Sequence, residues 1–410
     1  RGMDMYLTSL IHRDQLFQIT NRWFSGQAWP DDGRMLTEVF IFEQPVVPPT
    51  ILEIMNDIFR SVHPSPIHFR RITNKDELRH SILVHCEEPD ERIRELFQRF
   101  RNCAEEYFPR TPVNMILAEG DDGQLSGLTR IKSIRRIADK ASRRISDRLS
   151  GEINSTARTL AGIRAHEAGI PLERLVSSSS VMAVDFIEAE RIVSQSFKTS
   201  DIQLTPQDTH IDDVIGFKFV GSPEQLEVVR TAIIHHPRIQ IAESEIHIGN
   251  YNDTNLLIDI QLPPTGAIID RLKDQDWTSA SRRGLSESVL KHDLPAYVES
   301  GARSVRAEVI LTSFEELVES EYGRSIHEER TIRQRSTAAY SGRIAQNASY
   351  LIEYMLTLAI SPQVEVRELP VKLWGRYLPD MVSSIIWNLF GVESSMSVVF
   401  NNQLPPSVGV

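Results

Sequence analysis

The sequence predicts an α+β fold: a mixed β-sheet flanked by helices, preceded by a smaller N-terminal unit and followed by a helical tail. Strand and helix patterns alternate early in the chain, the later strands are separated by long helical stretches, and the last segment holds apolar helical patterns. A chain of 410 residues is long enough for two or three domains. We expect these domains at residues 1–122, 123–335 and 336–410.

The N-terminal unit is expected to contain four strands and two helices, identified by alternating apolar residues or by apolar residues at helical spacing. In chain order the expected elements are strand 38–44, helix 50–62, strand 67–72, strand 80–88, helix 90–108 and strand 113–120. This βαββαβ order is that of a ferredoxin-like unit. Such units serve many functions, so the order alone predicts none of them.

The central region is expected to open with a strongly basic helix and to continue through a helical insertion. Residues 222–224 (Ser-Pro-Glu) are typical of a helix start, with serine as the N-cap and proline at the first helical position. The expected elements are basic helix 128–151, helical insertion 152–210, strand 211–220, helix 222–236, two or three strands in 238–263, a mixed segment 264–304, a strand and helix in 306–333, and tail helices near 346–359 and 379–390.

The composition is that of an ordinary globular protein. A net charge of -11 argues against a broad nucleic-acid or membrane surface, although it leaves room for a local basic patch. No apolar run approaches the ~18 residues of a membrane span, and the opening residues lack the apolar core of a secretory signal. Cys86 and Cys103 supply neither a disulfide framework nor a metal cluster, so we expect a cytoplasmic protein.

Charged residues on three separated segments suggest a metal and phosphate site. Asp213 opens one expected strand and Glu308 lies on another; two such carboxylates can hold Mg²⁺, which takes oxygen ligands and shares them with phosphates. Arg130, Lys132 and Lys140 on the basic segment can neutralise a polyphosphate. Phosphoryl or pyrophosphoryl transfer depends mainly on positioning and charge stabilisation, and a carboxylate can also accept the proton of an attacking hydroxyl.

Each of these groups also has an ordinary structural explanation. The basic residues can form a solvated helix face, Glu308 and His327 can face water, and Tyr251 can belong to a plain turn. Asp213 and Lys218 can form a surface ion pair of little energetic value. Strict alternation places these two on opposite faces of a strand, so Lys218 either reaches the site through a bulge or pairs with an acid behind the sheet.

Five short motifs, in their order along the chain, resemble the synthetase domain of the RelA/SpoT (p)ppGpp synthetases, a branch of the nucleotidyltransferase superfamily. The resemblance covers roughly residues 128–335, with insertions near 145–208 and 264–304. Residues 129–132 (TRIK) resemble the family's G-R-x-K motif, with Lys140 as its further lysine. The other matching segments are 213–218 (DVIGFK), 249–255 (GNYNDTN), 308–312 (EVILT) and 321–327 (EYGRSIH).

The resemblance implies a nucleotidyltransferase-like fold and Mg²⁺-dependent transfer of pyrophosphate from ATP to the 3′-hydroxyl of GDP or GTP. Two carboxylates would hold the metal and assist the hydroxyl, basic residues would bind ATP, and an aromatic ring would stack on the acceptor base. The implied site residues are the catalytic and metal-binding Asp213 and Glu308, the ATP-binding Arg130, Lys132 and Lys140, and the acceptor-binding Lys218, Tyr251, Asn255 and His327.

The sequence departs from the family's pattern at Thr129, Asp253, Asn255, Ile310 and Leu311. These positions frame the metal site or contact the acceptor in the family, so two alternatives stay open. The acceptor can be the 3′ end of tRNA or an adenine nucleotide, or the chain can be a non-catalytic nucleotide-binding regulatory protein. The apolar tail can serve as core or as the face of a homo-oligomer.

Overall fold

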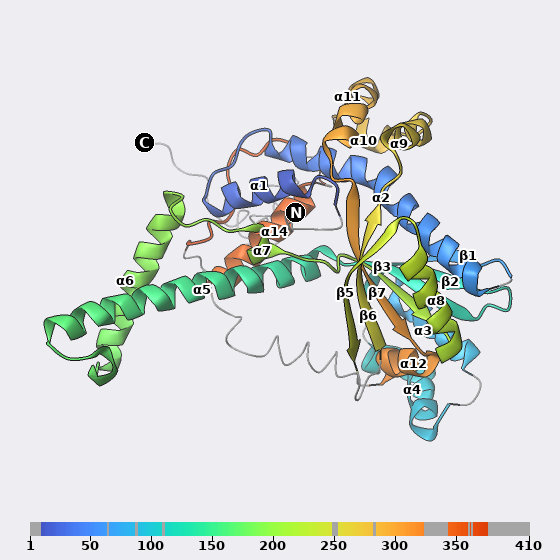
Figure 1. Ribbon diagram of the computed structural model, residues 1–410, viewed down its shortest axis with the longest axis horizontal. Helices are drawn as coiled ribbons and strands as arrows, with labels where there is room; N and C mark the ends of the chain where they lie inside the picture. The colour runs from blue at the N-terminus through green and yellow to red at the C-terminus, as the bar shows by residue number, and fades with distance from the viewer. Residues whose placement is uncertain are drawn as a thin grey trace, which may run out of the picture.

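One seven-stranded mixed sheet organises the chain (Figure 1). The computed structural model describes residues 10–375 except 64, 87–88, 109–110, 248–252, 282–283, 324–342, 360 and 362–363. The strands are β1 His68–Asn74, β2 Pro112–Glu119, β3 Leu125–Ile131, β4 Ile215–Val220, β5 Ile239–His247, β6 Asp253–Gln261 and β7 Ser304–Thr312. Their spatial order is β1-β2-β3-β4-β7-β6-β5, and every neighbouring pair is antiparallel except the parallel pair β4–β7.

Helices surround this sheet and extend beyond it. The described helices are α1 Arg13–Phe24, α2 Asp32–Val62, α3 Lys75–His85, α4 Glu91–Tyr107, α5 Ile134–Glu167, the 3₁₀ turn η1 Leu172–Arg174, α6 Ser179–Lys198, α7 Pro206–Thr209, α8 Pro223–His235, α9 Thr265–Leu272, α10 Thr278–Ser281, α11 Glu287–Ser300, α12 Phe314–Tyr322 and α14 Arg343–Leu358. None of them combines the length and apolarity that crossing a lipid bilayer demands.

The two faces of the sheet differ in chemistry. Side chains alternate across a strand, and on β7 the buried residues Val305, Ala307 and Val309 belong to the main hydrophobic core. Helices α1, α2, α8 and α14 contribute to the same core. The opposite face carries Arg306 and Glu308, which are only partly buried. A smaller cluster of apolar residues, contributed in part by α3, α4 and α12, covers one end of that face.

The prediction of a ferredoxin-like N-terminal unit is wrong. Residues 38–44 lie inside α2, and residues 80–85 form the second half of α3, so two expected strands are helical. The remaining strands, β1 and β2, pair with each other, and β2 continues into β3 of the central sheet. The expected boundary at residue 122 therefore falls in the β2–β3 turn.

The expected basic helix begins later than the sequence suggested. Residues 125–131 form β3, which pairs with β4, and the helix α5 starts at Ile134 after Ser133. Gly127 permits this close packing, because a Cβ atom there would lie 2.6 Å from the Lys218 carbonyl oxygen and 2.8 Å from Cζ of Phe59. Arg130 is thus a strand residue, and Lys132 lies between the strand and the helix.

Several other expectations are confirmed. The strand in 211–220 is β4, residues 238–263 hold the two strands β5 and β6, and α14 lies where the first tail helix was expected. Helix α8 begins as predicted, with Ser222 as N-cap and proline at the first turn. The helical insertion contains α6 and the distal half of α5, which project from the sheet (Figure 1). The expected helix at 379–390 lies outside the described residues.

Candidate functional site

A row of aligned residues crosses the centre of the charged sheet face. Arg130 on β3 lies opposite Gly216 on β4, and Gly216 lies beside Glu308 on β7. The Arg130 side chain extends over the glycine, since a Cβ atom at Gly216 would lie 3.3 Å from Arg130 Nε. Arg130 Nη2 donates a hydrogen bond to Glu308 Oε2 at 3.2 Å. The absence of a side chain at residue 216 therefore allows this ion pair to span β4.

Asp213 lies at the entrance to β4 and binds two lysines. Lys132 Nζ donates to Asp213 Oδ2 at 2.6 Å, and Lys140 Nζ donates to the same oxygen. Lys132 is held in place because its backbone N–H donates to the Val214 carbonyl at 2.8 Å. Lys140 projects from the second turn of α5. The TRIK motif, α5 and the start of β4 thus converge on one carboxylate.

The electrostatics of this cluster depend on burial. Burial lowers the pKa of Lys132 to about 8; the negative charge of Asp213 opposes this change, whereas Lys140 and Arg130 add to it. Burial alone would raise the pKa of Asp213, but the attraction of Lys132 and Lys140 outweighs it and holds that pKa well below its ordinary value. Asp213 is therefore a carboxylate throughout the neutral range.

Glu308 and Lys218 share the charged face with Arg130. Glu308 Oε1 accepts a hydrogen bond from Asn255 Nδ2 at 2.9 Å, so both carboxylate oxygens are engaged. Lys218 lies one row further along the strands, beside Ile310. Because Asp213 precedes the first residue of β4, the expected conflict of faces does not arise, and no bulge is needed. Burial lowers the pKa of Lys218, and Glu321 opposes that change.

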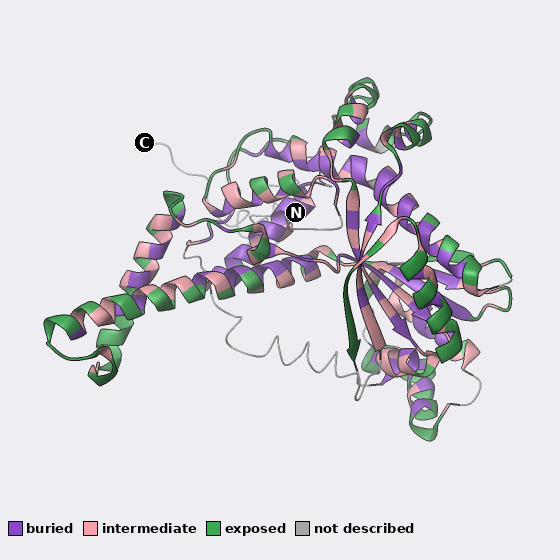
Figure 2. Ribbon diagram, viewed as in Figure 1, coloured by how far each residue is buried: buried purple, intermediate pink, exposed green. Residues whose placement is uncertain are grey.

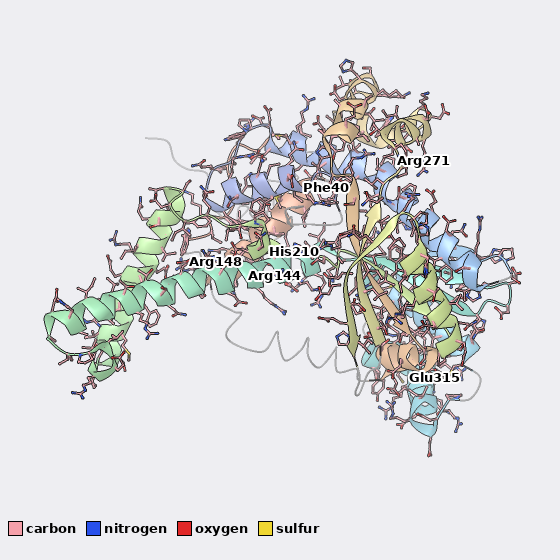
Figure 3. All side chains as sticks on the ribbon, in the orientation of Figure 1. Phe40, Arg144, Arg148, His210, Arg271 and Glu315 are labelled. Carbon is pink, nitrogen blue, oxygen red and sulfur yellow. The ribbon has the colours of Figure 1, made fainter. Side chains whose placement is uncertain are left out.

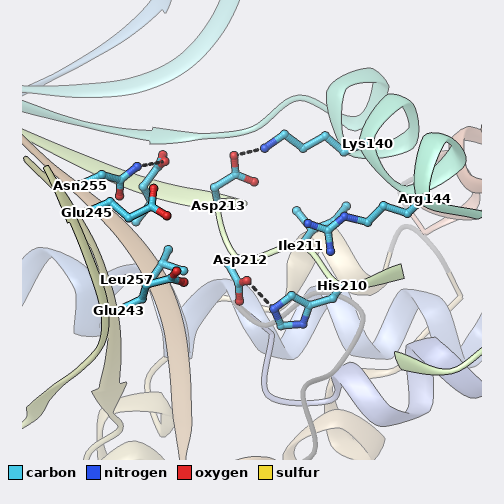
Figure 4. A pocket seen from close by; sticks show the side chains of 11 residues that line it. Lys140, Arg144, His210, Ile211, Asp212, Asp213, Glu243, Glu245, Asn255 and Leu257 are labelled. Atoms are coloured by element: carbon cyan, nitrogen blue, oxygen red, sulfur yellow. Dashed lines mark hydrogen bonds and ion pairs between the residues drawn. The ribbon is translucent and has the colours of Figure 1, made fainter. Parts of the chain in front are cut away.

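Asp213, Glu308, Lys140 and Asn255 line a cleft of about 180 Å³, whereas Arg130, Lys132 and Lys218 are not among its lining residues (Figure 4). Lys140 and Arg144 of α5 line one side, and Asn255 and Glu308 line the other, with Asp213 between them. The two predicted carboxylates thus face one space from different elements. A cationic wall and an acidic wall in one cleft can bind a ligand that carries both phosphates and hydrogen-bond donors.

An ion-pair network that the sequence analysis missed stands beside the cleft. Arg306 on β7 binds both carboxylate oxygens of Asp259 at 2.8 and 2.9 Å, and its Nη1 contacts Asp212 Oδ1 at 3.3 Å. Asp212 also pairs with His210. Because Asp212 precedes Asp213, this network fixes the segment carrying Asp213 to the strand carrying Glu308. The available signal was the two-residue spacing of Arg306 and Glu308, which places both on one face.

Three further lining residues were also missed. Arg144 lies one helical turn after Lys140, a spacing that puts both on the same side of α5. Figure 3 shows Arg144 and His210 close to each other, between the sheet and the projecting part of α5. Glu243 and Glu245 on the edge strand β5 complete the acidic wall. Figure 2 shows β5 as an exposed strand, which fits its position at the end of the sheet.

The positions that depart from the family's pattern are distributed over both faces. Thr129 points into the core, where its hydroxyl donates to the Met55 sulfur at 2.7 Å, and Leu311 is buried on the same side. Asp253 pairs with His247 at 2.7 Å, and Ile310 lies between Lys218 and Asn255 in the strand register. The remaining predicted site residues, Tyr251 and His327, lie outside the described residues.

The donor chemistry of the cleft fits a hard divalent cation. Asp213 and Glu308 offer carboxylate oxygens to the same space, and Mg²⁺ is bound through one or two carboxylates together with substrate phosphates. Both carboxylates bind cationic side chains in this structure. No group of three or more histidine, cysteine, aspartate or glutamate side chains in the described residues is arranged to hold a metal by itself. A metal here would therefore need ligands from the substrate.

Comparisons with known proteins contribute little. No protein-family model matches the chain, and no relative is found among the curated proteins. Among solved structures, the crystal structure of the small alarmone synthetase 1 from Bacillus subtilis matches 41% of this chain and 69% of its own, with 12% sequence identity and a TM-score of 0.17. Such an overlap carries no functional argument, so function is inferred from the geometry of the cleft.

Proposed function

We propose that this chain transfers pyrophosphate from ATP to the 3′-hydroxyl of a guanine nucleotide in a Mg²⁺-dependent reaction. The proposal depends on one observation: Asp213, bound by Lys132 and Lys140, and Glu308, bound by Arg130, face the same cleft. Two carboxylates surrounded by cations meet the requirements of phosphoryl-type transfer, in which positioning and charge stabilisation supply most of the catalysis. The five resembling motifs of the sequence support the same reaction.

Cations in and beside the cleft would bind the donor phosphates. Lys140 and Arg144 line the cleft, and the described residues offer Arg144 no ion pair, so it can bind a phosphate without breaking one. Arg130 is 39% exposed and can turn from Glu308 toward an incoming anion. Lys132 is buried against Asp213, and with a pKa of about 8 it is mostly protonated at neutral pH. It therefore maintains positive charge behind the carboxylate.

The carboxylates would serve the metal and the acceptor. Asp213 and Glu308 would hold Mg²⁺, which neutralises charge on the donor phosphates when bound. Glu308 would accept the proton of the attacking 3′-hydroxyl, and Asn255 keeps this carboxylate oriented through its hydrogen bond. Lys218 would contact the acceptor's phosphates. Tyr251 and His327 remain proposed acceptor-binding residues from the sequence motifs.

A non-catalytic nucleotide sensor is the second candidate. The observation in its favour is that both oxygens of Glu308 already bind side chains, as does one oxygen of Asp213. A cleft whose carboxylates are already paired with side chains can bind a nucleotide through its cations without assembling a metal site. Tight ATP binding without turnover would distinguish this sensor from the transferase.

The test is a transfer assay with an acceptor panel. The full chain is incubated with Mg²⁺, labelled ATP and each of GDP, GTP, ADP and bulk tRNA, and the products are resolved. We expect a pyrophosphorylated guanine nucleotide, lost on chelation of Mg²⁺ and reduced ~100- to 1000-fold by Asp213→Asn. Asp270→Asn is the matched control, because Asp270 of α9 forms an exposed pair with Lys273, the residue after that helix.

Each other outcome of this assay has a defined meaning. If product forms only with tRNA or only with ADP, that molecule is the acceptor in place of a guanine nucleotide. Binding of tRNA should then be sensitive to salt. ATP binding with no product from any acceptor would favour the regulatory sensor. An Asp213→Asn variant as active as wild type would refute the assignment of this cleft as the active site.

A further inference from the structure

Asp213 has one fixed and one exposed cationic partner. The side chain of Lys132 is 12% exposed, and its backbone N–H donates to the Val214 carbonyl, so this lysine stays beside the carboxylate. The side chain of Lys140 is 42% exposed and reaches Asp213 from α5. Both lysines donate to Oδ2 and neither donates to Oδ1. A ligand that draws Lys140 away therefore leaves Asp213 with a single buried lysine and an oxygen that neither lysine binds.

Glu308 has one neutral and one cationic partner. Asn255 donates to Oε1 at 2.9 Å, whereas Arg130 donates to Oε2 through one hydrogen bond of 3.2 Å. A single bond of this length is weaker than the two-bond form of an arginine–carboxylate pair. The Arg130 side chain lies over Gly216, which has no side chain that could hold the guanidinium in place. Arg130 is therefore the more easily displaced partner of Glu308.

The charges in contact with these carboxylates oppose the binding of a free divalent cation. Two carboxylates paired with three cationic side chains leave one positive charge in this group. A metal ion that binds Glu308 Oε2 must displace Arg130 against this repulsion. Glu243 and Glu245 add negative charge at the far wall, but they lie on the exposed strand β5, where water and salt screen them. Nucleotide phosphates reverse the balance, because they attract both the cationic side chains and the metal.

We propose that Arg130 and Lys140 form a gate that keeps Glu308 and Asp213 from a metal ion until nucleotide phosphates draw both cations away. The gate deepens the proposed transferase and rests on its assignment of these two carboxylates as metal ligands. It sets the order of binding: the nucleotide binds first, through the cationic side chains, and the carboxylates are released only in its presence. Lys132 does not leave, so it continues to hold Asp213 in position.

Binding of Mn²⁺ alone tests the gate without any reaction. The full chain is titrated with Mn²⁺ in the absence of nucleotide, and free Mn²⁺ is measured by electron paramagnetic resonance. The double variant Arg130→Gln with Lys140→Gln should bind Mn²⁺ at least ~10-fold more tightly than wild type, because both displaceable cations are removed. Adding Glu308→Gln to this variant should abolish the gain. Arg70→Gln removes the cation paired with Glu119 at the other end of the sheet, and it should bind Mn²⁺ as wild type does.

A second measurement tests the order of binding and needs only the wild-type chain. Its ligand is an ATP analogue with a methylene group between the α- and β-phosphates, which cannot donate pyrophosphate. Calorimetry in the presence of EDTA should show that this analogue binds without a metal. The double variant should bind it at least ~10-fold more weakly, since the cations that receive the phosphates are missing. Binding of the analogue only after a divalent cation is added would overturn the proposed order.

The gate and the proposed reaction can fail separately. Equal Mn²⁺ affinities of wild type and the double variant would refute the gate, and a successful transfer assay would still establish the transferase. The expected Mn²⁺ and analogue results without transfer to any acceptor would establish the gate in a nucleotide sensor and refute the reaction. A gain in Mn²⁺ affinity that survives Glu308→Gln would place the new metal site elsewhere and contradict the gate.

Discussion

The two faces of the central sheet are built from the same strands but depend on different forces. On β7, Val305, Ala307 and Val309 face the main core, while Arg306 and Glu308 face the charged side. Apolar residues on the first face are held by shape and burial, which tolerate little change in volume. The charged residues on the second face are held by individual ion pairs, which a charged ligand can replace.

This difference separates stability from function within one element. Burial of apolar area contributes roughly 25 cal/mol per Å², so the apolar face carries most of the folding free energy. Partly exposed ion pairs contribute about 0–1 kcal/mol each. Arg130–Glu308 is such a pair, and its loss costs the fold little. We therefore expect substitutions on the apolar face to lower stability and to spare activity. Substitutions on the charged face should lower activity and spare stability.

The largest expected effect is on the apolar face. Phe219 of β4 is 1% exposed, and its ring lies 5.0 Å from that of Phe59 on α2. Phe219→Ala should lower the free energy of unfolding by about 3–5 kcal/mol, because it leaves a cavity in the core. Urea denaturation measures this loss, with Ile246→Ala on the exposed edge strand as the control. Transfer activity per folded molecule should stay near wild type; a specific loss of activity would show that the faces are not separable.

The next effect is on the charged face, where activity should fall and stability should change little. Glu308→Gln should reduce the transfer rate at least ~100-fold, or about 2.7 kcal/mol, because the charge that holds the metal and accepts the proton is removed. The free energy of unfolding should change by less than about 1 kcal/mol. Glu119→Gln, which removes the partner of Arg70 at the other end of the sheet, is the control for both measurements. Large destabilisation by Glu308→Gln would show that the Arg130–Glu308 ion pair serves mainly to stabilise the fold.

The third effect is a pH dependence specific to the charged face. Burial sets the pKa of Lys132 at about 8 in the folded chain, against 10.5 for an ordinary lysine. The unfolded chain then binds more protons between pH 8 and 10.5, so the free energy of unfolding should rise across this window by up to about 1.4 kcal/mol per pH unit. Below pH 8 Lys132 is protonated in the folded chain, so the free energy of unfolding is lowered by the full cost of burying its charge.

The difference between wild type and Lys132→Met isolates this contribution from other alkaline titrations. Urea denaturation at several pH values from 7.5 to 10.5 should show a steeper rise for wild type. Parallel profiles for the two proteins would mean that Lys132 titrates at its ordinary pKa.

The sequence predicted the elements that carry local signals. Ser222 before proline identified the start of α8. The sequence also suggested that charged residues of separate segments converge, and in the structure Asp213 pairs with Lys132 and Lys140, and Glu308 with Arg130. Their roles in binding and catalysis stay predictions. The pairing itself could be anticipated because a buried carboxylate needs compensating charge.

The errors arose where tertiary packing overrode local preference. Residues 38–44 are rich in β-branched and aromatic side chains, yet they lie in α2, because Leu36, Val39 and Phe42 recur at helical spacing against the core. The missed start of α3 had a signal, since Asn74 and Glu77 form a capping box. The Arg306–Asp259 link joins neighbouring strands; the spacing of Arg306 and Glu308 indicates the face on which Arg306 lies but not its partner Asp259.

The parallel pairing of β4 with β7 has a consequence for the biosynthesis of this protein. Gly216 and Glu308 are adjacent in the sheet but belong to distant parts of the chain, and the hairpin β5–β6 and four helices are synthesised between them. Contacts between such distant residues form slowly, because a long loop must close first. On the ribosome the first half of the sheet emerges with β4 as an unpaired edge. The cleft is completed only after β7 leaves the exit tunnel, so an incomplete chain cannot assemble it.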